Sequence, residues 1–315
     1  MTEPARFVDD AVERLRHDVP GKAIVAASGG IDSTVAAVLA QRALGERARS
    51  LFVDTGLLRA GEVERVGEQF RESGLRYEVL PAADRFLSEL AGVVDPEEKR
   101  RRIGTTFIRL FETEADRFGT DRLIQGTIAP DWIESGGQLR DTIKTHHNVG
   151  GVPSDSRLTL VEPLRDLYKD EVRAVAEFLH IPRPGRQPFP GPGLAVRVNG
   201  ALTPQRVATC RAANAIVEEE IEKAVAAGRL APPWQYFAVL LDGRTVGVTG
   251  DNRSFGQAVS VRVVESVDAM TATAMAVPPD VLRTIAERIT RQLRGEVTRV
   301  LYDVTDKPPA TIEWE

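Results

Sequence analysis

The chain has 315 residues, of which 42% are hydrophobic and 28% charged, a balance that is typical of globular proteins and excludes a disordered or collagen-like chain. Its 41 lysines and arginines against 46 aspartates and glutamates leave a net charge of −5, so the general basic surface of a nucleic-acid-binding protein is absent. At roughly 150 residues per domain, the length predicts two domains.

Cys210 is the only cysteine, which excludes an internal disulfide and argues against a thiolate zinc site. No run of about 18 apolar residues that could span a membrane occurs. The N-terminal segment lacks the basic start and the apolar stretch of a signal peptide. We therefore expect a cytoplasmic protein with neither a membrane nor a nucleic acid among its partners.

Short apolar runs alternate with helix-forming segments in the first half of the chain, which predicts a parallel sheet with helices on both faces. The expected strands are 23–27, 50–53, 77–80 and 122–125. The expected helices are 34–44, 62–73 and 96–118. Gly45 and Gly74 follow two of these helices as C-cap signals.

Prolines and glycines make up eight of the thirteen residues from 181 to 193, a composition that neither a helix nor a central strand accommodates. We place a domain boundary there, between a first domain of residues 1–184 and a second of residues 185–315. The second is predicted to be a smaller α+β domain. Its expected helices are 203–227 and 279–293, and its expected strands are 236–241, 245–249, 258–264 and 299–303.

The segment SGGIDST, residues 28–34, joins the first strand to the first helix and suits an anion. Its glycines let the backbone approach a phosphate, and Ser28, Ser33 and Thr34 add hydroxyl donors. The free amides and the positive end of the helix dipole face the same point, and Asp32 suits a divalent cation. A Walker lysine is absent. A plain serine-capped turn is the alternative, but open α/β sheets bind ligands at this place.

This loop resembles the S-G-G-x-D-S loop of the N-type ATP pyrophosphatases, which cleave ATP between the α and β phosphates and adenylylate a substrate oxygen. The resemblance implies a doubly wound sheet of the adenine nucleotide alpha hydrolase type. It also implies that Asp32 is catalytic and holds Mg²⁺. The residues implied to bind ATP or pyrophosphate are Ser28, Gly29, Gly30, Ile31, Asp32, Ser33, Thr34, Val53 and Gly126. The loop alone does not separate NAD synthetase, asparagine synthetase, argininosuccinate synthetase and tRNA-modifying enzymes.

Five further segments narrow the resemblance to the synthetase part of GMP synthase, over nearly the whole chain. They are residues 52–59, 125–135, 143–151, 188–195 and 307–315, of which IKTHHNVGG and KPPATIEWE are long and specific. Small departures occur, since Ile31 stands where the family usually has Val, Gln187 where it often has His, and Phe255 where Tyr is common. None of them removes a charge that the chemistry needs.

The resemblance implies that ATP and Mg²⁺ activate the 2-oxygen of xanthosine 5′-monophosphate (XMP) as an adenylyl intermediate. Ammonia then attacks C2 and gives GMP, AMP and pyrophosphate. Lys144 would be catalytic in a lid that also carries His146 and His147, where a cation can meet the developing charge. The alternative for the two histidines is a surface or packing pair. A metal site is disfavoured, because adjacent residues rarely chelate one ion.

By the same resemblance, XMP would be contacted by Arg59, Lys307, Ile312 and Glu313, with the arginine and the lysine as phosphate partners. The apolar, proline-containing tail with Trp314 is expected to be docked rather than frayed, although an ordinary terminal strand is the alternative. Arg197 is a weaker candidate, because arginines are more often solvated surface than ligands.

A glutamine-hydrolysing domain needs a nucleophilic cysteine in a sharp, glycine-flanked turn. Cys210 instead lies in a predicted helix without a flanking glycine, so we expect it to pack in a core. The resemblance then implies a separate synthetase subunit whose ammonia comes from a glutaminase subunit. Residues 1–184 would be the ATP pyrophosphatase domain and residues 185–315 the domain for XMP binding and homodimerisation.

Two other functions stay open at this point. A different N-type pyrophosphatase, such as an NAD synthetase, would not need the tail from Lys307 onward. A nucleotide-binding regulatory subunit without activity would be favoured by the loss of Asp32 or Lys144, and both residues are present.

Overall fold

The computed structural model describes residues 3–129, 156–182, 187–267 and 269–315. The chain divides into two compact units. The first comprises Met1–Gly56, Gly61–Glu89 and Arg100–Gly185. The second comprises Leu57–Ala60, Leu90–Lys99 and Arg186–Glu315.

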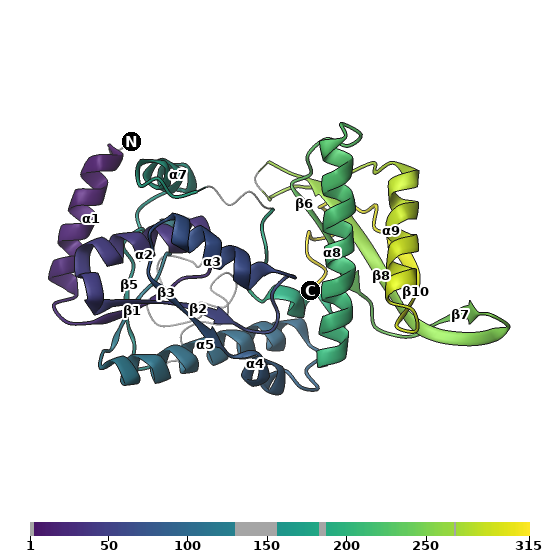
Figure 1. Cartoon of the computed structure of the whole chain (residues 1–315), viewed down its shortest axis with the longest axis horizontal. Coiled ribbons are helices and arrows are strands. Elements are labelled where there is room, and N and C mark those ends of the chain that lie inside the picture. The colour runs from purple at the N-terminus through teal and green to yellow at the C-terminus, as the bar shows by residue number, and fades with distance from the viewer. Residues whose placement is uncertain (1–2, 130–155, 183–186, 268) are drawn as a thin grey trace. The chain divides into compact units, whose positions relative to one another are not determined.

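A five-stranded parallel sheet in the order β3-β2-β1-β4-β5 forms the centre of the first unit. Its strands are β1 (Ala23–Ala26), β2 (Ala48–Asp54), β3 (Tyr77–Pro81), β4 (Arg122–Ile124) and β5 (Thr159–Val161). Helices cover both faces, with α2 and α5 on opposite sides of β1 and β2 (Figure 1). This burial explains why β1 is a continuous apolar run. The predicted parallel α/β sheet is confirmed, and β5 is a strand that the sequence did not predict.

The helices of the first unit are α1 (Pro4–Asp18), α2 (Ile31–Leu44), α3 (Glu62–Glu72), α4 (Ala83–Glu89), α5 (Pro96–Phe118, in this unit from Arg100) and α7 (Lys169–Phe178). The sequence predicted α2, α3 and α5 but not the other three. α2 is apolar on nearly every side because it packs against the sheet as well as against α1 and α7. Within the described ranges, no helix is both long and apolar enough to traverse a lipid bilayer.

The strand order places β1 at the topological switch of the sheet. The chain runs from β1 through β2 to β3 on one side and continues with β4 and β5 on the other. Connections that leave β1 and β4 therefore diverge at the carboxyl edge, where open α/β sheets bind their ligands. The loop of residues 28–30 and Gly126 both follow strands at this edge.

The second unit is a mixed sheet built around the long strand β8. The first part of β8 pairs with β7 as a hairpin, its last part pairs with β6 and β9, and β10 pairs with it in parallel. Its strands are β6 (Gln235–Leu240), β7 (Thr245–Thr249), β8 (Asn252–Glu265), β9 (Thr273–Ala274) and β10 (Val297–Tyr302). Its helices are α8 (Pro204–Ala226) and α9 (Pro279–Gln292). They pack against each other, α8 also on β6, so the predicted α+β architecture is confirmed.

Candidate nucleotide site

The turn from β1 into α2 requires a glycine at position 29. Gly29 has φ +83°, a conformation that L residues rarely adopt, and a Cβ atom there would lie 2.6 Å from a methyl carbon of Val66. Gly30 is the N-cap residue of the 14-residue helix α2. The sequence therefore builds a compact turn that leads directly into the start of a buried helix, whose dipole favours an anion at this end.

Three hydroxyl side chains brace this turn. Ser33 Oγ donates to the Gly30 carbonyl at 3.0 Å and lies 2.9 Å from Ser28 Oγ. Thr34 Oγ1 donates to the same carbonyl at 2.8 Å. The sequence assigned these hydroxyls to phosphate, and that role stays a prediction. In the structure they hold the loop in shape.

Gly126 follows β4 and lies against the first turn of α2. A Cβ atom at Gly126 would be 2.7 Å from Ser33 N and 2.8 Å from the carbonyl carbon and oxygen of Asp32. Only glycine permits this backbone approach. Val53, another residue predicted to bind ATP, lies near the carboxyl end of β2 with its side chain buried. The predicted nucleotide residues outside the lid thus come from the carboxyl ends of β1, β2 and β4.

The two carboxylate oxygens of Asp32 have different environments. Oδ2 accepts a hydrogen bond from Lys169 Nζ at 2.5 Å. Oδ1 is buried and has no hydrogen-bond partner among the residues that the structure describes. Sequence analysis missed Lys169, because it predicted neither β5 nor the helix α7 at whose start this lysine lies.

Thr127 Oγ1 and Glu162 Oε1 are also buried without a partner in the described part of the chain. With Asp32 Oδ1 they follow β1, β4 and β5, which neighbour one another in the sheet. A buried oxygen without a partner costs about 1–3 kcal/mol. Three of them at one edge of a sheet indicate a place where a ligand, a metal ion or water supplies the missing contacts.

The donor set fits Mg²⁺. A carboxylate oxygen such as Asp32 Oδ1 is a hard ligand of the kind that Mg²⁺ prefers, and this ion commonly uses one or two carboxylates together with phosphate and water. The described ranges hold no group of three or more histidine, cysteine, aspartate or glutamate side chains that could bind a metal without other ligands. The residues therefore suit a metal that arrives with its phosphates.

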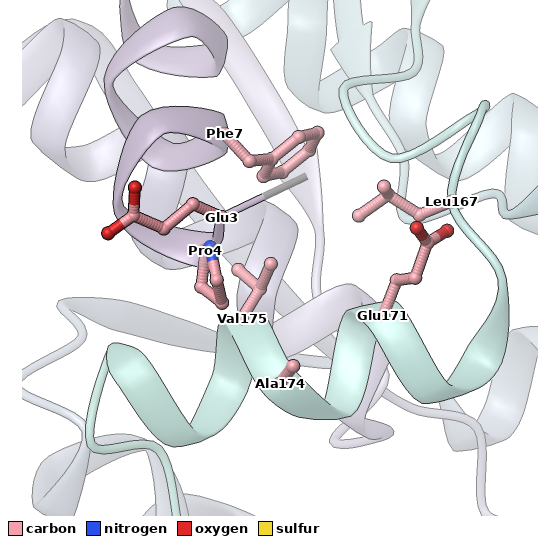
Figure 2. A pocket seen from close by; sticks show the side chains of 7 residues that line it. All are labelled: Glu3, Pro4, Phe7, Leu167, Glu171, Ala174 and Val175. Atoms are coloured by element: carbon pink, nitrogen blue, oxygen red, sulfur yellow. The ribbon is translucent and has the colours of Figure 1, made fainter. Parts of the chain in front are cut away.

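The described residues also enclose a small cavity of about 150 Å³ between α1 and α7. Figure 2 shows Phe7, Leu167 and Val175 around it, together with the carboxylates of Glu3 and Glu171. Two carboxylates repel a polyanion. The cavity includes none of the predicted site residues, so it is not the candidate nucleotide site.

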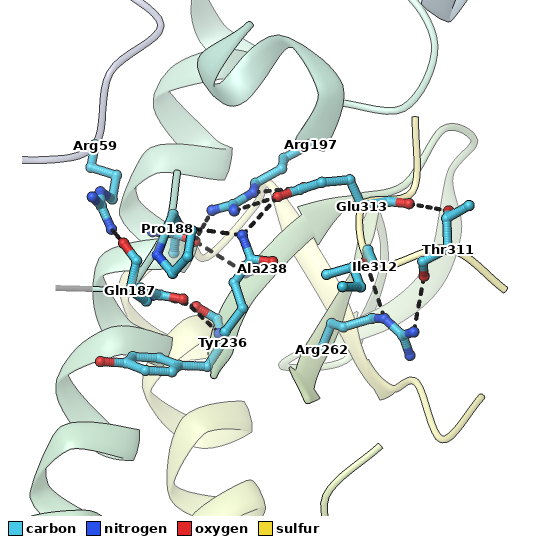
Figure 3. A network of polar contacts seen from close by, with 12 residues as sticks. Arg59, Gln187, Pro188, Arg197, Tyr236, Ala238, Arg262, Thr311, Ile312 and Glu313 are labelled. Atoms are coloured by element: carbon cyan, nitrogen blue, oxygen red, sulfur yellow. Dashed lines mark hydrogen bonds and ion pairs between the residues drawn. The ribbon is translucent and has the colours of Figure 1, made fainter. Parts of the chain in front are cut away.

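The four residues predicted to contact XMP all belong to the second unit. Arg59 is 6% exposed, and its guanidinium lies 3.4 Å from Glu218 Oε1 and 4.6 Å over the ring of Phe189. Gln187, which departs from the family pattern, donates to the Tyr236 carbonyl and accepts from the Tyr236 amide, both at 2.6 Å (Figure 3). The amide side chain of Gln187 therefore fits this position, because both its nitrogen and its oxygen form hydrogen bonds with the backbone of Tyr236.

Glu313 is held by a fully buried arginine. Arg197 donates from Nη2 to Glu313 Oε1 at 2.8 Å and from Nε to Oε2 at 3.0 Å (Figure 3). Gln235 Nε2 adds a third bond to the same carboxylate at 3.0 Å. The Arg197 guanidinium also lies 4.0 Å from the ring centre of Phe237. Arg197 is thus not the solvated side chain that the sequence suggested.

A second buried arginine, Arg262, fixes the backbone of the tail. It donates to the Thr311 carbonyl at 3.0 Å and to the Ile312 carbonyl at 3.2 Å (Figure 3). Ile312 packs in a cluster of buried apolar side chains. Lys307 Nζ donates to the Ala269 carbonyl at 2.8 Å. The tail is docked, as the sequence predicted, and contacts with XMP remain a prediction for all four residues.

Two further predictions concern single side chains. Cys210 is fully buried in α8 and its Sγ donates to the Arg197 carbonyl at 3.3 Å. This burial confirms the predicted packing residue, and it also raises the pKa of the thiol to about 11. The lid residues Lys144, His146 and His147 lie outside the described residues.

A parallel sheet whose central strand ends in a glycine-rich turn at a helix N-terminus places the first unit in the class of open α/β folds, in which such a turn suits a phosphate. The chain is 58% identical to the B-type subunit of GMP synthase (glutamine-hydrolyzing) from Thermococcus kodakarensis, over 98% of this chain and 99% of that protein. The protein of the same name from Methanopyrus kandleri is 54% identical over 100% of both chains. The chain belongs to this family of B-type GMP synthase subunits and is a ligase.

Residues 219–314 match the family described as GMP synthase C terminal domain. Among solved structures, NMN synthetase from Francisella tularensis is similar with a TM-score of 0.49 and 15% identity, over 74% of this chain and 89% of that one. This last similarity is too low to support an argument about function.

Proposed function

We propose that the chain catalyses the ATP- and Mg²⁺-dependent amination of XMP to GMP, with release of AMP and pyrophosphate. A separate glutaminase subunit supplies the ammonia. The observation that carries the proposal is the Asp32 carboxylate oxygen that has no partner among the described residues, beside the braced start of α2. It lies in a chain related to the B-type GMP synthase subunits over its whole length. The name of those relatives, one subunit of a glutamine-hydrolysing enzyme, supports the separate partner.

The reaction has two displacement steps. The 2-oxygen of XMP attacks the α-phosphorus of ATP, and the bond to the bridging oxygen of pyrophosphate breaks. Ammonia then attacks C2, and AMP leaves with the former 2-oxygen. Bound Mg²⁺ neutralises phosphate charge in the first step. The loop of residues 28–34 holds the leaving pyrophosphate, Asp32 holds the metal, and Gly126 lets the two segments approach.

Phosphate recognition for XMP is assigned to the second unit. The ammonium of Lys307 bonds to the neutral carbonyl of Ala269 and makes no ion pair with a described carboxylate, so its charge is available to a phosphate. Arg59 is the second cation of the proposed site. The carboxylate of Glu313 already accepts hydrogen bonds from Arg197 and Gln235. These bonds support a role for Glu313 in holding the C-terminal tail, which also carries Lys307, in place.

The chain is further proposed to form a homodimer through its second unit. Val246 and Val248 on β7 and Phe255 on β8 are 53%, 78% and 49% exposed. Val246 and Phe255 are direct partners in the hairpin and lie on one face. The opposite face is covered, because Thr245 Oγ1 and Thr298 Oγ1 lie 2.5 Å apart. An exposed apolar face on a hairpin is typical of an association surface. The cytoplasmic location stays a prediction from the sequence.

The activity is tested by following XMP through its ultraviolet absorbance, with ATP and Mg²⁺ and either ammonium chloride or glutamine. We expect XMP to be consumed with ammonium and not with glutamine, because the only cysteine is buried and its thiol pKa is raised to about 11. Asp32→Asn should abolish pyrophosphate release and leave the circular dichroism spectrum unchanged. Consumption with glutamine alone, or none with ammonium, would contradict the proposal.

A further inference from the structure

Lys99 is a buried cation that the proposed reaction does not use. It lies in the first turn of α5, in the segment Leu90–Lys99 that belongs to the second unit, and its side chain is 0% exposed. Burial removes the ammonium from water, and the helix dipole disfavours a positive charge in the first turn. Both effects oppose a lysine here, so its presence must be explained by the groups that its ammonium contacts.

Three acceptors of the second unit contact the ammonium of Lys99. Nζ donates to the Val198 carbonyl at 2.8 Å, to the Ala195 carbonyl at 3.3 Å and to Glu315 Oε2. These acceptors match the three donors of an ammonium. Glu315 lies 216 positions away in sequence and supplies the negative charge. The lysine therefore ties the start of α5 to the C-terminal tail.

The other carboxylate oxygen of Glu315 is also hydrogen-bonded. Oε1 accepts from Asn199 Nδ2 at 2.8 Å and from the Gly200 amide at 3.0 Å. The side chain of Glu315 is 4% exposed. Both charges of the pair are thus shielded from water and are fixed by hydrogen bonds to the same short segment, residues 195–200.

A second glutamate of the tail meets a buried cation in the same way. Glu313 lies two residues before Glu315 and accepts two hydrogen bonds from the buried Arg197 (Figure 3). Trp314 stands between the two glutamates and is 39% exposed. A shift of the tail by one residue would take both carboxylates away from their cations and bring Trp314 to one of them. Arg197 and Lys99 together therefore define a single register of the tail, as inward-facing residues do for a strand.

The buried pair is better suited to selecting this register than to adding stability. Removing two charges from water costs free energy that their attraction only offsets, so apolar side chains of similar size often stabilise a fold equally well. A buried charge that has lost its partner, in contrast, is strongly disfavoured. Arrangements of the tail that separate Lys99 from Glu315 are therefore excluded, which an apolar contact would not achieve.

We infer that Lys99 is a positioning residue for XMP. Through Glu315 it fixes the register of the tail, which carries three of the residues proposed to contact XMP: Lys307, Ile312 and Glu313. Lys99 acts through Glu315 and is assigned no contact with XMP or ATP. The inference deepens the proposed function and rests on its assignment of XMP to the tail.

Two variants separate this role from a contribution to stability. Lys99→Met leaves the Glu315 carboxylate buried without its cation, so the denaturant midpoint should fall. Lys99→Met/Glu315→Leu replaces both charges by apolar side chains of similar size, so the midpoint should return toward the wild-type value. XMP affinity should be about 10- to 100-fold lower in both variants, because neither contains the pair that selects the register. Affinity for pyrophosphate with Mg²⁺ should stay at the wild-type value in both.

Calorimetry measures the two affinities, and steady-state kinetics with ammonium give an independent readout. In the double variant the KM for XMP should rise about 10- to 100-fold while kcat stays within about 3-fold, because saturating XMP holds the tail in the productive register. The KM for ATP should not change. A loss of stability alone would lower the amount of active enzyme and leave the KM for XMP as it is.

Glu315→Gln is a milder change that keeps the test valid if Lys99→Met does not fold. The amide oxygen of this variant still accepts from Asn199 and Gly200, so only the charge is lost. Its XMP affinity should fall about 3- to 10-fold, since a charge-assisted hydrogen bond to Lys99 becomes a weaker one.

Lys223→Met is the matched control. Lys223 is a 59% exposed cation on α8 of the same unit, where it bonds to Glu219 and Glu220. Its removal changes the charge of the unit by the same amount as Lys99→Met does. We expect the affinities for XMP and pyrophosphate to stay at the wild-type values.

The outcomes separate the inference from the proposed function. If the double variant binds XMP as the wild type does, the pair serves packing and the inference is wrong. Wild-type XMP affinity in Lys99→Met or Glu315→Gln also overturns it, as does an equal loss of XMP and pyrophosphate affinity. A wild-type chain that binds no XMP would instead refute the proposed function, and the inference would fall with it.

Discussion

Gly126 is the residue at which the geometry of the candidate site is most easily disturbed. Gly126→Ala places a methyl group 2.7 Å from Ser33 N, so the start of α2 or the connection after β4 must move. We expect the free energy of unfolding to fall by about 1–3 kcal/mol. Pyrophosphate affinity should fall as well, because the same shift displaces Asp32. Denaturant titration and calorimetry measure the two effects.

Gly21→Ala is the control for this prediction. Gly21 lies in the same unit, and a Cβ atom there would meet nothing within 4 Å. The control should therefore keep both the stability and the pyrophosphate affinity of the wild type. Equal behaviour of the two alanine variants would show that the close approach at Gly126 is not required.

Cys210 gives a second prediction for a single residue. Burial raises the pKa of its thiol to about 11, so only about one thiol in a thousand is ionised at pH 8. A disulfide reagent such as Ellman's should not react with the folded chain on the time scale of minutes. The unfolded chain should react at once, as an ordinary thiol does. Rapid reaction of the folded chain would mean that α8 opens and exposes this position.

At the residue scale, the sequence predicted the position of the loop of residues 28–34 but not every side chain that contacts it. The spacing of residues 28–34 was enough to place a glycine-rich turn between the first strand and the first helix, and its phosphate role stays a prediction. The bond between Lys169 and Asp32 was not predictable, because it depends on where an unpredicted helix begins. Arg197 was treated as a weaker candidate, since its contact with Glu313 spans 116 positions of sequence and has no local signal.

Charged side chains join the two helices α8 and α9 at the element scale. Glu219 accepts from Arg288 at 2.7 Å and from Lys223 at 2.6 Å. These hydrogen bonds lower the pKa of its carboxyl group from 4.5 to about 2. Because the pKa is lower in the folded state, the stabilisation is present above pH 4.5 and is lost as the pH falls from about 4.5 to about 2.

Between pH 5 and pH 3, the free energy of unfolding should therefore fall less in the Arg288→Met variant than in the wild type. Tryptophan fluorescence follows unfolding, with Trp234 and Trp314 in the second unit and Trp132 in the first. The denaturant midpoint at each pH gives the comparison. Arg283→Met is the control, because this arginine is an exposed cation on the same helix. Added salt should lower the stabilisation by the Arg288–Glu219 ion pair, since water reaches both side chains. An identical pH profile in all three proteins would contradict the prediction.

Elements with a strong apolar run were predicted, and among the shorter or amphipathic ones β5 and α7 were missed. The buried run of β1 and the all-round apolar α2 gave clear signals. β5 has three residues, like the predicted β4, but it is an edge strand whose residues are exposed or only partly buried, so it lacks the buried apolar run that marked β4. α7 does show apolar residues at helical spacing, with Val172, Val175 and Ala176 buried. That signal was present in the sequence and was missed.

At the scale of the whole molecule, the order of the strands could not be obtained from local patterns. The alternation of strands and helices predicted a parallel sheet, but not that β4 pairs with β1. The second unit takes residues 57–60 and 90–99 from the first half of the chain, which a boundary placed by composition does not anticipate. Both features depend on contacts between distant segments, which a single sequence does not encode in its periodicity.

The association of two chains is the prediction that belongs to this largest scale. The hairpin of β7 and the first part of β8 lies at one end of the second unit's sheet (Figure 1). Its exposed apolar side chains are Val246, Val248 and Phe255. Val248→Asp puts a charge on this face beside the Val246–Phe255 pair, where it could not be desolvated without cost. We expect the wild type to be a dimer and the variant a monomer by light scattering, with an unchanged circular dichroism spectrum.

Val267→Asp is the matched control, because Val267 is 100% exposed and lies beyond the end of β8. This variant should stay dimeric. A monomeric wild type would refute the homodimer, and a Val248→Asp variant that remains a dimer would exclude the hairpin as its interface. If the prediction holds, activity with ammonium measured on the Val248→Asp monomer decides whether each chain carries a complete site. Retained turnover would mean that association serves stability or the glutaminase partner rather than the chemistry.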